Sequence, residues 1–283
     1  MTWRIGVDIG GTFTDAALVN EETSEIGIAK TLTTPGDFGE GVVNALKQAI
    51  EAYSVPPDTV SLLSHATTVV TNAILEEKGA RTALIATRGF RDILELRRSS
   101  RADLYDMFQD PPAVLVPRHR RLEITERIDA QGDVVIPLAQ DEIDQIVEEI
   151  KALNVDAVAV SLLFSFLNDS HERTLGEALR AALPETPVFL SSEVLPEIRE
   201  FERTSTTAVC AYVGPILDSY LSQLEEAVSG LNLPPLHVMG SAGGVVDVRR
   251  DHAVTGGRGA VACTIPGRDR VRVGTRRDGE DRT

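Results

Sequence analysis

Hydrophobic and polar residues alternate along this chain with two different periods, which predict strands and helices in turn. Three runs of period two, at 4–8, 13–19 and 25–31, predict a three-stranded meander. Helical spacing follows over 38–53 and stops at Pro56-Pro57. Later runs predict strands over 60–64, 81–86, 122–128, 134–136, 157–162, 188–190 and 236–239, and helices ending at Leu75 and covering 90–94, 140–153, 171–182 and 198–228. We expect Pro215 to break or kink the last helix. This alternation predicts a layered α/β fold with a mixed sheet.

The turn between the first two predicted strands is the most informative part of the sequence. It carries Asp8, Gly10, Gly11, Thr12, Thr14 and Asp15. Glycines let backbone N–H groups approach an anion closely, the threonines add hydroxyl donors, and Asp8 is placed to hold a hydrated Mg²⁺ beside a phosphate. The alternative is an ordinary tight hairpin with polar ends. Neither a Walker-type loop nor a dinucleotide-binding glycine fingerprint occurs in the chain.

A second candidate region lies where the fourth predicted strand meets a helix, over Ser64–Asn72. Ligands often bind at such junctions of α/β sheets, and a helix N-terminus offers free N–H groups. Thr67 or Thr68 can cap this helix. The alternative interpretation is a capped helix with a structural histidine, His65.

Three later segments combine polar residues with strand or helix ends. Over 87–95, Arg91 can grip a carboxylate or phosphate, or it can simply form helix-surface ion pairs. The segment 165–173 predicts a strand exit and an N-capped helix with a structural role. The segment 192–207 is dense in carboxylates, which can serve a metal or acid–base site but more often form a solvated helix face.

Composition restricts the class of protein. The net charge of −15 argues against nucleic-acid or anionic-membrane surfaces. Two cysteines, Cys210 and Cys263, fit a reducing compartment, and we see neither a signal peptide nor a run long enough to span a bilayer. We therefore expect a cytoplasmic protein. Residues 249–283 contain nine Arg, no Lys and five acidic residues without periodicity, which predicts a non-native or disordered tail.

The segments together resemble the N-terminal region of the ATP-dependent hydantoinase and oxoprolinase family, which includes subunits of acetone-type carboxylases. The likeness extends over about residues 3–248. It departs from the family pattern at Ala66, where the family commonly has glycine, at Asp169 in place of proline, and at Ala242 in place of asparagine. The resemblance implies the first half of an actin/Hsp70/sugar-kinase-like, ribonuclease H-like fold. It also implies an N-terminal region over 1–195, the start of a truncated hydantoinase A domain over 196–248, and the tail over 249–283.

The resemblance further implies an ATP-dependent hydrolase of a cyclic amide such as hydantoin or 5-oxoproline, with a hydantoinase B-type partner and an oligomeric assembly. ATP and Mg²⁺ would be used, with Asp8 at the metal and Gly10, Gly11, Thr12, Thr14 and Asp15 around the phosphates. The substrate pocket would involve His65, Thr67, Thr68, Asn72, Arg91 and Asp92. A carboxylase subunit and a non-catalytic nucleotide-binding module are the alternatives. Because the family's second phosphate hairpin does not occur in the sequence, we expect this chain alone to be nearly inactive.

Overall fold

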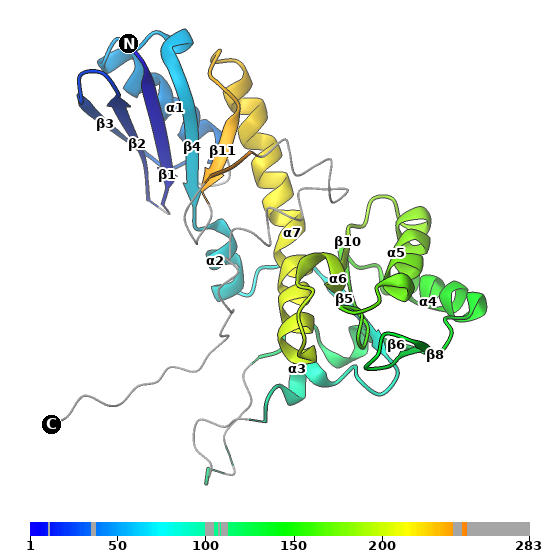
Figure 1. Ribbon diagram of the computed structural model, residues 1–283. Coiled ribbons are helices and arrows are strands. Elements are labelled where there is room, and N and C mark those ends of the chain that lie inside the picture. Colours follow the sequence, from blue (N-terminus) through cyan, green and yellow to red (C-terminus); the bar gives the residue numbers. More distant parts are fainter. Residues whose placement is uncertain are drawn as a thin grey trace, which may run out of the picture. The chain divides into compact units, whose positions relative to one another are not determined.

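The computed structural model describes residues 1–10, 12–34, 38–99, 105–106, 108, 113–239 and 245–247. The chain divides into two compact units, drawn in Figure 1. The first contains residues 1–80 and the described residues from 213 onward, and the second contains 81–212.

A six-stranded mixed sheet organises the first unit, with the strand order β12-β11-β4-β1-β2-β3. Strands β1, β2 and β3 form an antiparallel meander, whereas β4 and β11 run parallel to β1. The elements of this unit are β1 (Trp3–Ile9), β2 (Phe13–Asn20), β3 (Ile26–Leu32), α1 (Phe38–Ala52), the 3-10 turn η1 (Pro57–Thr59), β4 (Val60–Thr67), α2 (Val69–Leu75), β11 (Leu236–Met239) and β12 (Val245–Asp247).

Period-two burial defines the two faces of this sheet. Ile5 and Val7 of β1 are buried, and so are Ala16 and Leu18 of β2, which lie beside them in the register. The helix α1 packs on this face and contacts all three meander strands. A side chain at Gly41 of α1 would come within 3.3 Å of the Thr14 hydroxyl, so this glycine permits the close approach of helix and sheet.

Tyr53, just after α1, lies against the edge strand β3. Its ring occupies the space that a side chain at Gly27 would need, with ring atoms 2.7–2.8 Å from an added Cβ. The Tyr53 hydroxyl accepts a hydrogen bond of 3.1 Å from the N–H of Ile28. Because Ile28 belongs to a non-hydrogen-bonded pair of the β2–β3 ladder, this N–H points away from β2, and Tyr53 satisfies it.

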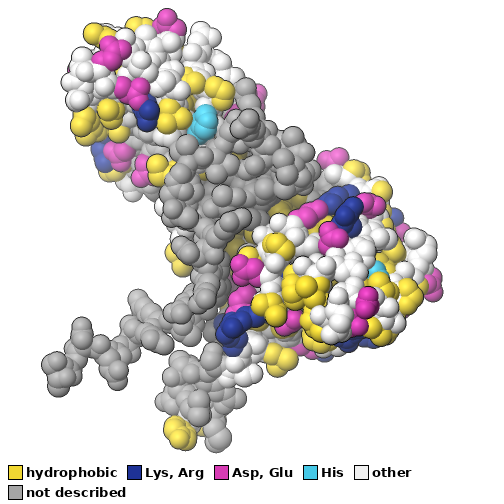
Figure 2. Space-filling model, in the orientation of Figure 1, with side chains coloured by type: hydrophobic (Ala, Val, Ile, Leu, Met, Phe, Trp, Pro, Cys, Tyr) yellow, Lys and Arg dark blue, Asp and Glu magenta, His cyan; other side chains and the backbone are white. Residues whose placement is uncertain are grey.

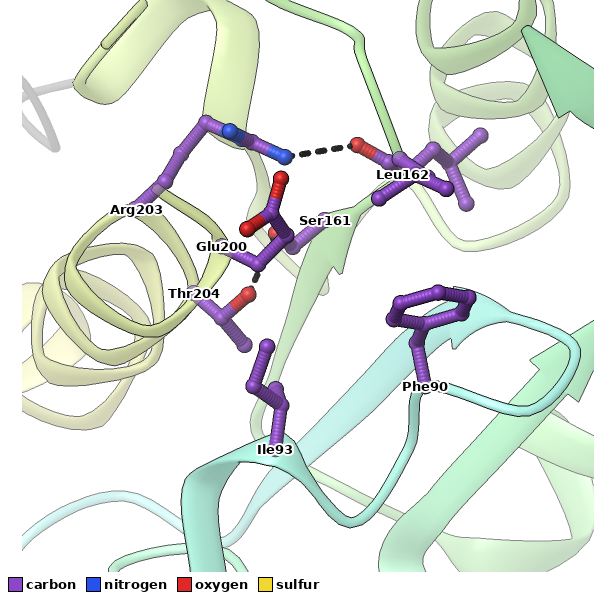
Figure 3. Close-up of a pocket in the computed structure, with 8 residues that line it drawn as sticks. Phe90, Ile93, Ser161, Leu162, Glu200, Arg203 and Thr204 are labelled. Atoms are coloured by element: carbon purple, nitrogen blue, oxygen red, sulfur yellow. Dashed lines mark hydrogen bonds between the residues drawn. The ribbon is translucent and has the colours of Figure 1, made fainter. Parts of the chain in front are cut away.

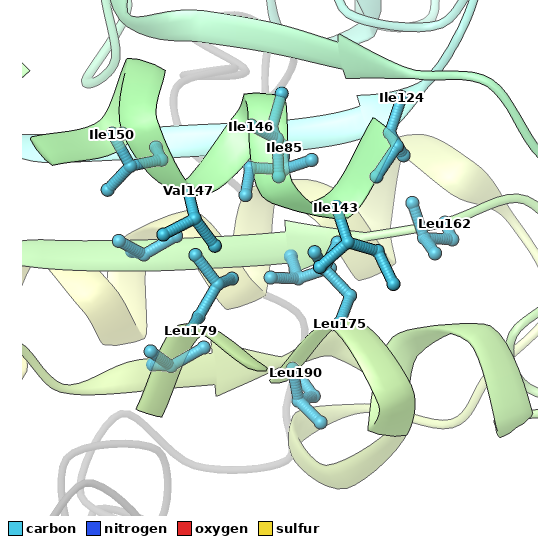
Figure 4. Close-up of a cluster of buried hydrophobic side chains, with 14 of the residues drawn as sticks. Ile85, Ile124, Ile143, Ile146, Val147, Ile150, Leu162, Leu175, Leu179 and Leu190 are labelled. Carbon is cyan, nitrogen blue, oxygen red and sulfur yellow. The ribbon is translucent and has the colours of Figure 1, made fainter. Parts of the chain in front are cut away.

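The second unit is built on a four-stranded parallel sheet of order β10-β9-β5-β6. Every residue of β5 and β9 is buried, as expected for central strands of a parallel sheet. A core of branched aliphatic side chains from the sheet, α4 and α5 fills this unit (Figure 4). Its elements are β5 (Thr82–Thr87), α3 (Ile93–Leu96), the 3-10 turn η2 (Arg118–Arg120), β6 (Arg121–Ile124), β7 (Arg127–Ile128), β8 (Val134–Ile136), α4 (Gln140–Leu153), β9 (Ala157–Ser161), α5 (Ser170–Ala182), β10 (Val188–Leu190) and α6 (Ser191–Val194).

The helix α7 (Glu200–Ser229) contributes its first residues to the second unit and its later residues to the first. Pro215 lies inside it and does not end it, so of the expected break or kink the break is wrong and the kink stays a prediction. The fixed φ of proline suits a helix, and the buried neighbours Val213 and Leu217 supply packing that offsets the lost hydrogen bond.

The predicted mixed α/β class and nearly all predicted elements are confirmed. The predicted strand 122–128 is wrong in extent, because it divides into β6, which pairs with β5, and β7, which pairs with β8. The strand β12 was not predicted. The predicted glycine turn at 240–244 and the predicted tail at 249–283 lie outside the described residues. The two compact units divide the chain after residues 80 and 212, and the predicted domain boundary at 195/196 stays a prediction.

Candidate functional site

The hairpin between β1 and β2 closes on Gly10, whose N–H donates to the Phe13 carbonyl over 2.9 Å. Thr33, just beyond β3, holds this turn. Its N–H donates to the Thr12 carbonyl at 3.0 Å, and its hydroxyl donates to the Gly10 carbonyl at 2.9 Å. The predicted phosphate residue Gly11 lies outside the described residues. The sequence interpretation missed Thr33, although the hydroxyl run at 31–34 signals it.

The two threonines of the turn have different surroundings. The Thr14 side chain is fully buried, and its hydroxyl lies 3.1 Å from that of Thr33. Thr12 is exposed. Thr14 therefore supports the turn from inside, whereas Thr12 is available to a ligand at the tip.

Asp8 and Asp15 are cross-strand neighbours on the face of the sheet opposite to α1. Asp8 is exposed, and Asp15 forms an ion pair of 2.8 Å with Lys30. Side chains directly opposite in such a ladder have Cβ atoms about 4.5–5.5 Å apart. Mg²⁺ usually keeps several waters and takes one or two carboxylates, so this pair fits the expected ion. Within the described residues, no cluster of three or more His, Cys, Asp or Glu side chains could hold a metal.

His65, at the end of β4, is completely buried. Its Nδ1 lies 3.1 Å from the Val7 carbonyl, which can only accept, so Nδ1 carries the proton. Its Nε2 then accepts a hydrogen bond of 2.6 Å from the Tyr220 hydroxyl of α7. Burial lowers the pKa of His65 from 6.5 to about 4, although the bond to Val7 acts in the opposite direction. His65 therefore forms two internal bonds in this structure, and its expected place in the substrate pocket stays a prediction.

Tyr220 connects His65 to the start of α2. Burial raises the pKa of Tyr220, a hydrogen bond from Thr67 opposes the rise, and the charge of Asp8 adds to it. The Thr67 hydroxyl oxygen in turn accepts from the Val69 N–H over 3.2 Å. A continuous chain of hydrogen bonds thus runs from β1 through His65, Tyr220 and Thr67 to the first turn of α2.

The remaining predicted residues of this junction, Thr68 and Asn72, are exposed. Asn72 Nδ2 donates to the Thr68 hydroxyl over 3.4 Å, and its backbone N–H donates to the Thr68 carbonyl. Both belong to the same unit as Asp8, so the structure places eight predicted residues in the first unit besides the turn glycine: Asp8, Thr12, Thr14, Asp15, His65, Thr67, Thr68 and Asn72.

The predicted residues Arg91 and Asp92 belong to the second unit. Arg91 lies 3.5 Å from a carboxylate oxygen of Glu123. Asp92 accepts from Arg121 at 3.2 Å, and Arg121 also donates to Glu95 at 2.6 Å. Arg121 is nearly inaccessible to solvent, so it is the buried centre of this ion-pair network. It was not singled out in the sequence because it lies at the start of a strand pattern.

A small hollow also lies in the second unit. Its lining combines apolar and polar side chains: Phe90, Ile93, Ser161, Leu162, Leu163, Glu200, Arg203 and Thr204. Figure 3 shows Arg203 donating to the Leu162 carbonyl (3.0 Å) and the hydroxyls of Ser161 and Thr204 meeting at 2.7 Å. These polar groups bond to one another, which gives the hollow a packed polar wall.

Two buried carboxylates of the second unit were not predicted as functional. Glu126 contacts His171 Nδ1 at 2.8 Å and accepts from the Thr87 hydroxyl. Glu172 accepts from the Leu162 N–H at 2.8 Å and from the Ser191 hydroxyl at 2.6 Å. These bonds match the structural role predicted for the segment 165–173, because they fix the strand exit to the start of α5.

Comparison with known proteins identifies the class. Residues 4–183 match the hydantoinase/oxoprolinase N-terminal region, and the chain belongs to this family. It is 35% identical over 261 residues to the caprolactamase subunit alpha of Pseudomonas jessenii, covering 89% of this chain and 37% of that subunit. It is 32% identical over 226 residues to the acetophenone carboxylase gamma subunit of Aromatoleum aromaticum, covering 74% of this chain and 31% of that subunit.

Solved structures agree. The ATP-dependent caprolactamase from Pseudomonas jessenii superposes with a TM-score of 0.77 at 35% identity, over 86% of this chain and 36% of that one. Nucleotide-free acetone carboxylase superposes with a TM-score of 0.81 at 23% identity, over 93% of this chain and 38% of that one. The fold is therefore that of these enzymes, consistent with the actin-like ATPase class. The chain spans about a third of the length of these relatives.

No helix among the described residues is long and apolar enough to cross a bilayer.

Proposed function

We propose that this chain is the nucleotide-binding N-terminal part of an ATP-dependent hydrolase of cyclic amides, of the hydantoin or 5-oxoproline type. The observation that carries the proposal is the exposed Asp8 at the end of β1, next to a glycine turn whose Gly10 carbonyl accepts a hydrogen bond from the Thr33 hydroxyl. Membership of the family and similarity to an ATP-dependent caprolactamase support it.

In the proposed site, Asp8 would hold a hydrated Mg²⁺ on the exposed face, with Asp15 and Lys30 beside it. The ion would neutralise phosphate charge and orient a phosphate oxygen. Gly10, Gly11 and the exposed Thr12 line the phosphate position. Thr14 and Thr33 keep the turn in shape, and Thr67, Thr68 and Asn72 form the neighbouring edge of the site.

The proposed reaction begins with transfer of the terminal phosphoryl group of ATP to the amide oxygen, with ADP leaving. Water then adds to the activated carbon, the C–N bond breaks to open the ring, and a second water releases phosphate from the resulting acyl phosphate. Within the second unit, Arg91 and Asp92 would support the substrate pocket. A hydantoinase B-type subunit or domain would complete the enzyme in a cytoplasmic oligomer. Phosphoryl transfer needs both sides of the nucleotide to be positioned, so we propose that the isolated chain turns over ATP very slowly.

Binding of Mg-ATP tests the proposal directly. The wild-type chain should bind Mg-ATP in isothermal titration calorimetry, and Asp8→Asn should weaken binding about tenfold or more through loss of the metal ligand. Asp58→Asn, on the 3-10 turn η1, is the matched control and should leave the affinity unchanged. Equal affinities for the wild type and Asp8→Asn would refute the assignment of this site.

An alternative candidate is the ATP-using subunit of a ketone carboxylase, favoured by the likeness to the acetophenone carboxylase gamma subunit and to acetone carboxylase. A full-length protein that carries this chain distinguishes the two. Cyclic amide hydrolase activity predicts ADP release with hydantoin, 5-oxoproline or caprolactam, whereas a carboxylase predicts it only with a ketone and bicarbonate. Mg-ATP binding without any turnover would favour a non-catalytic nucleotide-binding module.

A further inference from the structure

Lys30 lies in the same row of the sheet as the two aspartates of the proposed site. The register pairs Asp8 of β1 with Asp15 of β2, and it pairs Asp15 with Lys30 of β3. Residues opposite one another in antiparallel strands point to the same face, so all three side chains lie on the face opposite to α1. The row crosses the meander close to the glycine turn, because β2 begins at Phe13.

Two contacts fix the position of the Lys30 ammonium group. Its Nζ donates to both carboxylate oxygens of Asp15, at 2.8 and 3.1 Å. It also lies 4.8 Å from the centroid of the Phe13 ring, within the range of a cation–π interaction. The side chain therefore crosses from β3 to β2 and places its charge beside the residue that follows Thr12 of the turn. Its exposed fraction is 52%, so a ligand can reach it.

The three meander strands carry one other cationic side chain, and it lies far from the turn. Arg4 belongs to β1 but lies at the end away from Asp8, where it pairs with Glu21. Figure 2 shows acidic, basic and hydrophobic side chains interspersed on the visible surface of the described residues. Lys30 is therefore distinguished by its place beside the turn.

The sign of the charge in this row depends on Lys30. Two carboxylates and one ammonium group give a net charge of −1, and the expected Mg²⁺ at Asp8 would change it to +1. Without the ammonium group, the same row would carry a charge of −2, and the ion would only neutralise it. Lys30 thus makes the metal-loaded row net positive, which favours the phosphates of a nucleotide.

We propose that Lys30 contacts a phosphate oxygen of the bound Mg-nucleotide and that Asp15 is the positioning residue that holds Lys30 there. The inference rests on the proposed function, since it adds a residue to the same site. A lysine ammonium group binds phosphate as a point charge with three donors. A carboxylate is an acceptor only and offers a phosphate oxygen no hydrogen bond, so Asp15 acts on the nucleotide through Lys30.

The simplest alternative is an ordinary surface ion pair between Asp15 and Lys30. Exposed pairs contribute little to stability, so removing the Lys30 charge should leave the fold intact under either interpretation. The two interpretations differ in nucleotide binding, because a surface pair of this kind has no contact with the ligand.

Isothermal titration calorimetry of the full chain with Mg-ATP tests the role of Lys30. Lys30→Met should bind Mg-ATP about tenfold or more weakly than the wild type, because it loses a charged donor to phosphate. Lys47→Met is the matched control, since it removes the same charge from an exposed position on α1, at the other face of the sheet. The control should bind like the wild type. Equal affinities for the two variants would overturn the proposal.

Asp15→Asn separates positioning from simple repulsion. If Asp15 only adds negative charge to the site, its neutralisation should strengthen Mg-ATP binding. If it positions Lys30, binding should weaken about threefold or more, and this loss should vanish in the Lys30→Met background, because the two residues act as one unit. Stronger binding by Asp15→Asn would overturn the positioning role. A loss that persists in the Lys30→Met background would mean that Asp15 acts directly on the ion, and would overturn it equally.

The outcome is separable from that of the proposed function. Absence of Mg-ATP binding by the wild type would overturn both. Binding that Asp8→Asn weakens and Lys30→Met does not would leave the proposed function in place and overturn only the role of Lys30. Circular dichroism of each variant checks that it is folded.

Discussion

The Tyr220 hydroxyl donates a 2.6 Å hydrogen bond to Nε2 of His65, and this contact joins α7 to the end of β4 inside the first unit. The two rings also pack in a tilted arrangement, with centroids 5.7 Å apart. Since Thr67 and Asp8 both act on the same hydroxyl, Tyr220 links the strand ends that carry the proposed site.

Tyr220→Phe should destabilise the protein by about 1–3 kcal/mol, because a buried ring nitrogen of His65 loses its donor. Urea unfolding followed by circular dichroism measures this. Tyr53→Phe is the matched control. Its hydroxyl serves an N–H that water can reach in its absence, so it should cost under about 1 kcal/mol. An equal decrease in the free energy of unfolding for the two variants would mean that the buried Tyr220–His65 hydrogen bond stabilises the protein no more than the exposed Tyr53 bond does.

Stability should fall with acidification between pH 6.5 and about 4. In this window the unfolded chain binds a proton at His65 and the folded protein does not, so the free energy of unfolding rises with pH. The contribution of His65 to that free energy reaches its full value above pH 6.5. The full contribution is about 3 kcal/mol. Unfolding midpoints of the wild type and of His65→Gln, measured from pH 4 to 8, should differ in slope within this window. Parallel curves would contradict the assignment of a neutral, buried His65.

Thr33→Val should destabilise the hairpin tip, since the hydroxyl bond to Gly10 disappears and the buried Thr14 hydroxyl loses its neighbour. We expect a loss of about 1–3 kcal/mol in urea unfolding. Thr33→Ser retains the hydroxyl and should recover most of the stability. If serine proves as damaging as valine, the methyl group of Thr33 and not its hydrogen bonds holds the turn.

Arg121 and Arg91 should respond differently to truncation. Arg121→Met removes a buried guanidinium from Asp92 and Glu95 and should cost about 1–3 kcal/mol. Arg91→Met breaks a partly exposed pair at 3.5 Å and should cost under about 1 kcal/mol. Thermal unfolding of the two variants provides the comparison, and a larger effect at Arg91 would argue against the network described here.

Periodicity predicted the strands and helices because burial follows period two in β1 and β2 and helical spacing in α4 and α5. Periodicity failed to predict the ends of a strand where contacts between distant segments determine them. Glu126 lies between β6 and β7 and contacts His171, 45 residues away, and the strand predicted over 122–128 divides at this point. Such a contact leaves no local signal.

The candidate site was predicted unevenly for the same reason. A glycine turn after an apolar strand is a local feature, and it places Asp8 at the exposed end of β1. The role of His65 depends on its hydrogen bond with Tyr220, which lies 155 residues later, and the spacing of residues in the sequence does not predict this contact. Arg121 and Thr33 were missed because each acts through partners from another segment.

Tyr53 has one more consequence, for the behaviour of the chain at high concentration. By engaging the outward amide of Ile28, it removes a docking point from the β3 border of the six-stranded sheet, where a neighbouring molecule's extended segment could otherwise attach. Growth of intermolecular β-structure from this border is thereby disfavoured, even though the border strand is rich in isoleucine and leucine.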